Sequence, residues 1–135
     1  MQSVEFTIPD KPISLQRVRS TPKGIFYDPQ SVIKKRVVNH VMAQINDFKI
    51  SSEPLQLQIA FYFEMPKSWS KKKKERMRLK YHTSRSDIDN LIKFILDTFN
   101  GILYEDDAQI SRIVAYKMWD DIPRTCIRLS ELEPI

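Results

Sequence analysis

Acidic side chains gather at the two ends of a single stretch, residues 86–107. Asp87 and Asp89 stand near its start, and Asp106 and Asp107 stand near its end. Carboxylates drawn together repel one another, and a cation or protons relieve that repulsion. Oxygen ligands without a neighbouring Cys or His suit Mg²⁺ or Mn²⁺ rather than zinc. A metal ion held by aspartates on a basic protein is a common means of phosphodiester hydrolysis, so these acids are candidates for such a site.

A structural interpretation of the same acids stays open. The helix dipole favours Asp near a helix N-terminus, and an Asp-Asp pair after an apolar run can be a polar turn. Lys93, one helical turn after Asp89, adds a cation beside the acids. Its alternative role is an i,i+4 ion pair that contributes only a few tenths of a kcal/mol. The combination of four acids and one lysine favours a functional site.

An amphipathic helix is expected between the two acidic ends. Ser86, with Asp89 three residues later, is typical of an N-cap, and Asn100-Gly101 supplies a residue able to adopt positive φ, which ends the helix. Asp97 continues a polar ridge with Asp89 and Lys93. Six apolar residues recur at helical spacing and form one stripe: Ile88, Leu91, Ile92, Ile95, Leu96 and Phe99.

Four strands and further helices are expected around this stretch. Residues 2–8, 55–63, 109–118 and 124–129 alternate between apolar and polar side chains, which is typical of half-buried strands. Residues 31–48 predict a second long helix, and Ser70 predicts the cap of a short helix that runs through Arg78. Residues 9–29, with four prolines, predict a long irregular segment. The order predicts an α/β (α+β) fold in a single domain, residues 1–135: about four strands in a mixed sheet, with two helices packed on one face.

The net charge of +5 is unevenly spread. Between Lys67 and Arg85, nine Lys or Arg residues stand against one acid, Glu75. This block can hold a nucleic-acid backbone while the acids hold the metal that cuts it, although a solvated basic loop is the alternative. Phe26 and Tyr27, near further basic residues, either stack on an exposed base or fix their loop to the core. The candidate DNA-binding residues are Arg17, Arg19, Lys23, Lys67, Lys71, Lys72, Lys73, Lys74, Arg76 and Arg85.

Composition indicates the class of protein. Hydrophobic residues make up 41% of the 135, which predicts a packed core. No run of 18 apolar residues and no charged-then-apolar leader is present, so we expect neither a membrane span nor a secretory signal. A lone cysteine, Cys126, cannot form an internal disulfide, which fits a cytoplasmic location. The two histidines lack a placement that indicates a role: His40 is expected on the surface, and His82 in a loop without a partner to exchange protons with.

The acidic stretch resembles the RusA family of Holliday junction resolvases. The resemblance lies in Asp87-Ile88-Asp89-Asn90-Leu91-Ile92-Lys93, in Leu96-Asp97 and Asn100-Gly101, and in Asp106-Asp107-Ala108-Gln109-Ile110. The segments Met65-Pro66-Lys67-Ser68-Trp69-Ser70-Lys71-Lys72 and Phe26-Tyr27-Asp28-Pro29 are also similar to that family. The combined pattern covers most of the chain.

The resemblance implies a homodimeric, Mg²⁺-dependent endonuclease (with Mn²⁺ as a possible substitute) that resolves four-way DNA junctions in recombination and repair. It implies a bacterial or phage origin and no small-molecule cofactor. The family's essential carboxylates match Asp87, Asp89 and Asp107, its lysine matches Lys93, and Asp106 matches a less critical fourth acid. Phe94, off the apolar stripe, is a candidate contact for the dimer.

This interpretation requires the three aspartates to converge in space around one cation, with Lys93 stabilising charge on the phosphate. Two other functions stay open: a metal-dependent nuclease for flaps or other branched DNA, and a non-catalytic DNA-binding module.

Overall fold

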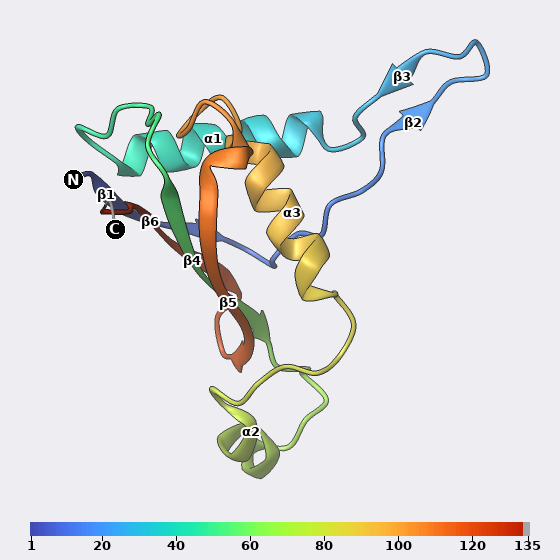
Figure 1. Ribbon diagram of the computed structural model, residues 1–135. Coiled ribbons are helices and arrows are strands. Elements are labelled where there is room, and N and C mark those ends of the chain that lie inside the picture. The colour runs from blue at the N-terminus through green and yellow to red at the C-terminus, as the bar shows by residue number, and fades with distance from the viewer. Residues whose placement is uncertain (134–135) are drawn as a thin grey trace.

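Alternating side chains build a four-stranded sheet in the computed structural model, which describes residues 1–133. The strands are β1 (Ser3–Pro9), β4 (Leu55–Glu64), β5 (Ile110–Asp120) and β6 (Arg124–Glu131), in the order β1-β6-β4-β5 (Figure 1). β6 runs antiparallel to β1 and β4, whereas β4 and β5 are parallel. The expected mixed sheet in a single domain is confirmed.

One face of this sheet is covered by helices. On β4 the residues that point to that face are all buried: Leu55, Leu57, Ile59, Phe61 and Phe63. Helix α1 (Ser31–Gln44) packs beside β1, and α3 (Ile88–Phe99) packs against β5 and α1. The parallel β4–β5 pair needs a long crossover, and that connection carries both the short helix α2 (Lys71–Met77) and α3. Ser70 caps α2 through Lys73 N–H, as expected.

Two expectations for the helices are wrong. α1 ends at Gln44 rather than at residue 48, because Ile45 has an extended backbone. Phe94 is not a surface contact: it is 2% exposed and belongs to the core, whereas Ile92 and Leu96 on the expected stripe are only half-buried. The buried face of α3 is therefore rotated toward Phe94 and Thr98, while Ile92 and Leu96 pack against the edge of the core.

The segment expected to be irregular contains a small hairpin. β2 (Arg19–Ser20) and β3 (Phe26–Tyr27) pair antiparallel and form an arm that projects from the body (Figure 1). The buried amide of Gln30 holds the base of the arm: its Oε1 accepts Gln16 N–H at 2.9 Å, and its Nε2 donates to the Ser14 carbonyl at 2.9 Å. Leu15 N–H donates to the Asn90 carbonyl, so the arm starts beside the first turn of α3. Within residues 1–133, no helix is both long and apolar enough to cross a membrane.

Candidate active site

The start of α3 leaves two carboxylates free. The N-cap is Asp87 rather than Ser86, whose backbone has a φ of 92°, and the Asp87 side chain makes no capping hydrogen bond. Lys117 fixes the approach to the helix, because its Nζ donates to the carbonyls of Ser84 and Ser86 at 3.1 and 2.9 Å. Asp87 and Asp89 are both exposed. The expected Ser86 cap is thus wrong, and the acid that replaces it points a charged group to solvent instead of satisfying the helix.

Lys93 is held only loosely. Its Nζ lies 3.8 Å from Asp89 Oδ2, and both side chains are more than half exposed. An exposed i,i+4 pair of this kind contributes about 0.3–0.5 kcal/mol at most. Lys93 is therefore available to contact another group.

The end of α3 is built by a tight turn. Gly101, with a φ of 77°, ends the helix as expected, and a short 3₁₀ helix (Asp107–Gln109) follows. Asp106 caps it: its Oδ1 accepts Ala108 N–H at 3.0 Å, while Gln109 Oε1 accepts Asp106 N–H at 2.9 Å. Gln109 Nε2 also donates to the carbonyls of Ser51 and Glu53, which ties this turn to the loop before β4.

The two neighbouring acids of this turn differ in environment. The backbone N–H of Ala108 lowers the pKa of Asp106, and its contact with Asp107 lowers it further. The pKa of Asp107 is raised instead, first by its contact with Asp106 and then by partial desolvation and by the negative charge of its neighbours. Asp107 thus has unfavourable negative charge beside it and no cation paired with it in the described chain.

The aspartates do not converge within one chain. Asp97 contributes to the shifted pKa of Asp107, so the two lie at the same end of α3. Asp87 precedes Asp97 by ten residues, which is about 15 Å along a helix. Two oxygens on one Mg²⁺ are within about 4 Å of each other. In the part of the chain that the structure describes, no three acidic, His or Cys side chains are grouped closely enough to hold a metal ion. The expected convergence of three aspartates around one cation is therefore not found within the described residues of a single chain.

Asp97 takes part in an ion-pair bridge that the sequence did not indicate. Lys34 on α1 bridges Asp28, at the end of the arm, and Asp97 on α3. The ammonium group lowers the pKa of Asp28. Lys34 stands in a run with Lys35 and Arg36, and only the rotation of α1 selects which of the three turns inward, so the sequence held no clear signal.

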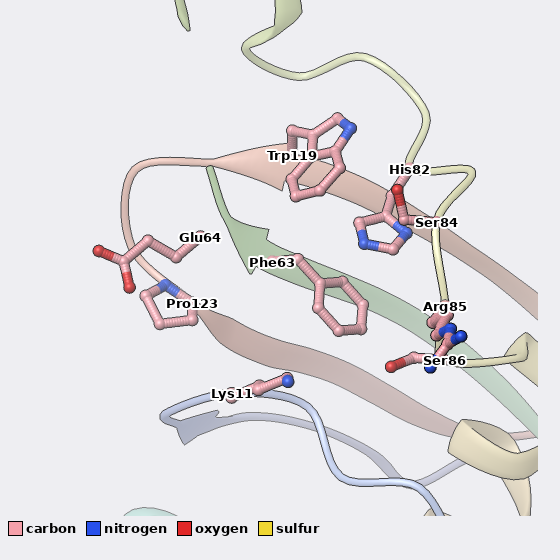
Figure 2. Close-up of a pocket in the computed structure, with 9 residues that line it drawn as sticks. All are labelled: Lys11, Phe63, Glu64, His82, Ser84, Arg85, Ser86, Trp119 and Pro123. Atoms are coloured by element: carbon pink, nitrogen blue, oxygen red, sulfur yellow. The ribbon is translucent and has the colours of Figure 1, made fainter. Parts of the chain in front are cut away.

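A cavity of about 390 Å³ lies directly before α3 (Figure 2). Ser86 and Arg85 form one wall, and Lys11 lies across from them. His82 is 6% exposed and lies between Phe63 and Trp119, with ring centroids 4.3 and 4.1 Å away. Its Nδ1 has no hydrogen-bond partner among the described residues, and burial lowers its pKa. His82 is thus a neutral, buried wall residue rather than a solvent-exposed proton carrier.

The candidate DNA-binding residues form two groups. The arm carries Arg17, Arg19 and Lys23, and α2 with its flanking loops carries the other seven; the two groups project on opposite sides of α3 (Figure 1). Lys73 Nζ lies 4.4 Å from the centre of the Trp69 ring, whereas Lys71, Lys72 and Arg76 on α2 are exposed. Phe26 is 77% exposed, so the alternative in which it fixes the arm to the core is wrong. The acids at the start of α3 thus lie between two basic projections.

Comparison with known proteins identifies the family. The family described as endodeoxyribonuclease RusA matches residues 9–130. The chain belongs to the RusA endodeoxyribonuclease family. The match contains both acidic ends of α3, Lys93, the arm and α2. The uncharacterised protein YqaN of Bacillus subtilis (strain 168) is 31% identical over 140 residues, which cover 98% of this RusA-family chain and 99% of YqaN. Since that relative's name states no activity, the family match carries the assignment: a nuclease that hydrolyses DNA.

Proposed function

We propose that this RusA-family protein is a homodimeric, Mg²⁺-dependent endonuclease that resolves four-way DNA junctions by paired cuts, in DNA recombination and repair. The observation that supports it is a difference among acids. Asp97 and Asp106 have partners that neutralise or fix them, whereas Asp87, Asp89 and Asp107 are exposed and lack a strong one. The three free acids are those that match the family pattern.

A second copy of the chain can supply the aspartate that each proposed cation site lacks within one chain. Each chain has Asp87 and Asp89 at one place and Asp107, with Asp106, at another. In a two-fold dimer, the first pair of one chain can meet Asp107 of the partner subunit, and symmetry then creates an identical second site. Two equal sites suit a junction, which itself has two-fold symmetry and needs one cut in each of two strands. The exposed position of both pairs supports this arrangement.

The residues of each site then take separate roles. A divalent cation bound by the aspartates would polarise the scissile phosphate and lower the pKa of an attacking water. Lys93, exposed one turn from Asp89, contacts the phosphate and stabilises the negative charge that develops on it. The arm and α2 hold two different DNA segments, because they project on opposite sides of α3 (Figure 1). Phe26, at the outer part of the arm, stacks on a base that is unpaired at the branch point.

Cleavage of a synthetic four-way junction tests the activity. We expect symmetric nicks with Mg²⁺ or Mn²⁺ and none with a chelator. Three-way, flap and linear duplex DNA of the same sequence serve as controls. Stronger cleavage of flaps than of four-way junctions would favour the branched-DNA alternative. Binding without any scission under all metal conditions would favour the DNA-binding module.

Mixing two inactive variants tests the shared site. Asp89→Asn and Asp107→Asn each inactivate a homodimer. In the mixed dimer, one site receives both substitutions, whereas the other combines a native Asp89 with a native Asp107 from the partner subunit. Random exchange makes half of the dimers mixed, so about a quarter of the wild-type sites return. If each chain held a complete site, every site would carry a substitution and no activity would return.

A further inference from the structure

The cavity directly before α3 has an aromatic wall that contains an unpaired polar atom. The His82 ring lies between Phe63 and Trp119 and points into the cavity (Figure 2), and all three side chains are buried. Among the described residues, His82 Nδ1 has no hydrogen-bond partner. Nearly all buried polar groups in folded proteins are paired, so an unpaired one beside a cavity of about 390 Å³ indicates that the cavity takes a ligand.

Two cations stand at the sides of the same cavity. Lys11 and Arg85 both line it, both are exposed, and neither is in an ion pair within residues 1–133. Burial, and then the charges of Lys117 and Lys11, lower the pKa of His82, so the potential inside the cavity is positive. The lining fits a ligand that sets a negative charge beside Lys11 and Arg85 and a planar apolar part against the rings.

One acid in the lining distinguishes a nucleotide from a bare anion. Figure 2 shows Glu64 and Arg85 on opposite sides of the cavity, and the exposed Glu64 carboxylate repels an anion that enters alone. A carboxylate accepts hydrogen bonds from an amino group, and the neutral imidazole of His82 offers one donor and one acceptor. Nucleobases carry amino donors and ring acceptors on their edges and stack on aromatic side chains with their faces. A nucleobase with its phosphate therefore matches the lining better than inorganic phosphate does.

The cavity adjoins the free acids at the start of α3. Ser86 lines it, and Asp87 follows directly in the chain. Lys117 Nζ donates to the carbonyls of Ser84 and Ser86, so the wall that carries these two serines is fixed. A DNA strand with one phosphate at Asp87 therefore has its neighbouring nucleotide beside the cavity.

We propose that the cavity binds one nucleobase of the strand to be cut, turned out of the base stack beside the scissile phosphate, while Lys11 and Arg85 contact the phosphate of that nucleotide. The identity of this strand rests on the proposed function. Turning a base out of the stack costs least where the base is already unpaired, as at a branch point. The cavity thus favours branched DNA over linear duplex, and it binds a different base from the one that Phe26 contacts.

Fluorescence of Trp119 tests whether a base enters the cavity. A Trp69→Phe background leaves Trp119 as the single tryptophan. The probe is a single-stranded tetranucleotide that contains all four bases, with a chelator present to prevent cleavage. We expect saturable quenching by this probe. An abasic tetramer with the same phosphates should bind at least about 10-fold more weakly, because it lacks bases that stack.

Two tyrosine variants show where the probe binds. Ser84 lines the cavity at an exposed position, so Ser84→Tyr should fill the cavity and weaken probe binding by about 10-fold without unfolding the chain. Thr83→Tyr is the matched control, since Thr83 is equally exposed and does not line the cavity; it should bind the probe as the background protein does. Melting curves check that both variants fold. Absent quenching, an equal loss in both variants, or equal binding of the abasic tetramer, which would identify a phosphate site only, overturns the proposal.

An abasic four-way junction tests the position of the base. Single abasic residues are placed directly 5′ of the mapped cut, directly 3′ of it, or far along the same arm, and binding is measured with a chelator present. At one of the two adjacent positions, removal of the base should weaken binding by wild type at least about 10-fold more than binding by Ser84→Tyr. The remote abasic residue should affect both proteins equally. No such difference at either adjacent position also overturns the proposal.

Failure of the proposed function gives a different result. In that case the tetranucleotide still quenches Trp119 and Ser84→Tyr still weakens its binding, but wild-type protein cleaves no branched DNA with Mg²⁺ or Mn²⁺. Conversely, metal-dependent junction cleavage without quenching by the tetranucleotide leaves the function intact and overturns the base site.

Discussion

Both ends of α3 carry aspartates, but the carboxylates at the two ends differ in the partners that they contact. At the C-terminal end, Asp97 is paired with Lys34, and Asp106 accepts a backbone N–H. At the N-terminal end, Asp87 makes no capping bond and Asp89 has only a long, exposed contact with Lys93. Acids with close partners stabilise the fold, whereas free acids cost electrostatic energy unless something outside the chain binds them. A close partner also sets Asp97 and Asp106 apart from Asp107 at the same C-terminal end, so the presence of a partner separates structural carboxylates from the proposed functional ones more clearly than residue type does.

The largest expected effect contrasts Asp89→Asn with Asp97→Asn. Asp89→Asn should reduce junction cleavage by more than about 100-fold, since it removes a proposed cation ligand. Junction affinity in a gel-shift assay and the free energy of unfolding should stay within about 0.5 kcal/mol of wild type, because the side chain is exposed. Asp97→Asn should show the opposite pattern. It should lower the free energy of unfolding, measured with urea, and should reduce junction cleavage far less than Asp89→Asn does. Equal losses of cleavage in both variants at equal stability would remove the distinction between the two ends.

Lys93 should show a smaller effect on the same chemistry. Lys93→Met is expected to lower the single-turnover cleavage rate by about 10- to 100-fold, because it removes a cation that contacts the phosphate. Its exposed contact with Asp89 contributes little, so thermal stability should be unchanged. Lys35→Met, an exposed lysine on α1, is the control for loss of one positive charge. A rate loss of the same size in Lys35→Met would reduce the role of Lys93 to general attraction of DNA.

Local patterns predicted much of this molecule. Alternation located the four strands of the sheet, helical periodicity located α3, and Asn100-Gly101 marked its end. These features depend on neighbours a few residues apart, which the sequence shows directly. The acidic motif also selected Asp87, Asp89 and Asp107; among the described residues, Asp87 and Asp107 are in no ion pair, and Asp89 has only the exposed contact with Lys93.

Features that depend on distant contacts could not be predicted. Ser86 matched an N-cap pattern, yet Lys117, about thirty residues later, holds its carbonyl and shifts the cap to Asp87. Phe94 interrupted the expected stripe, but the packing of α3 against β5 and α1 turned it into the core. Convergence of the aspartates is a property of two chains in the proposed dimer, and a single sequence does not state which surface is shared.

A substitution of Lys34 tests whether its bridge between Asp28 and Asp97 stabilises the C-terminal end of α3. Lys34→Met leaves Asp28 and Asp97 without their shared cation and should lower the free energy of unfolding by about 1–2 kcal/mol; the partial exposure of both acids limits the loss. Because Asp28 stands at the end of the arm, proteolysis of the arm should also become faster. Lys35→Met again serves as the control, now with no expected change in stability. Unchanged unfolding of Lys34→Met would show that the bridge contributes nothing to fixing α1 on α3.

The smallest expected effect concerns His82, in the wall beside the free acids. Burial holds its pKa below the usual value, and Lys117 and Lys11 add to the shift. The unfolded chain takes up a proton near pH 6.5 whereas the folded chain does not, so stability is constant above about pH 7.5 and falls as the pH is lowered below about 6.5. One proton limits the slope to about 1.4 kcal/mol per pH unit. His82→Phe keeps an aromatic ring between Phe63 and Trp119, and melting curves from pH 7.5 to 5.5 should show a smaller acid loss than in wild type. His40→Gln, at an exposed site on α1, should leave the wild-type slope unchanged. If His82→Phe and wild type lose stability in parallel as the pH falls, then a group other than His82 causes the acid sensitivity.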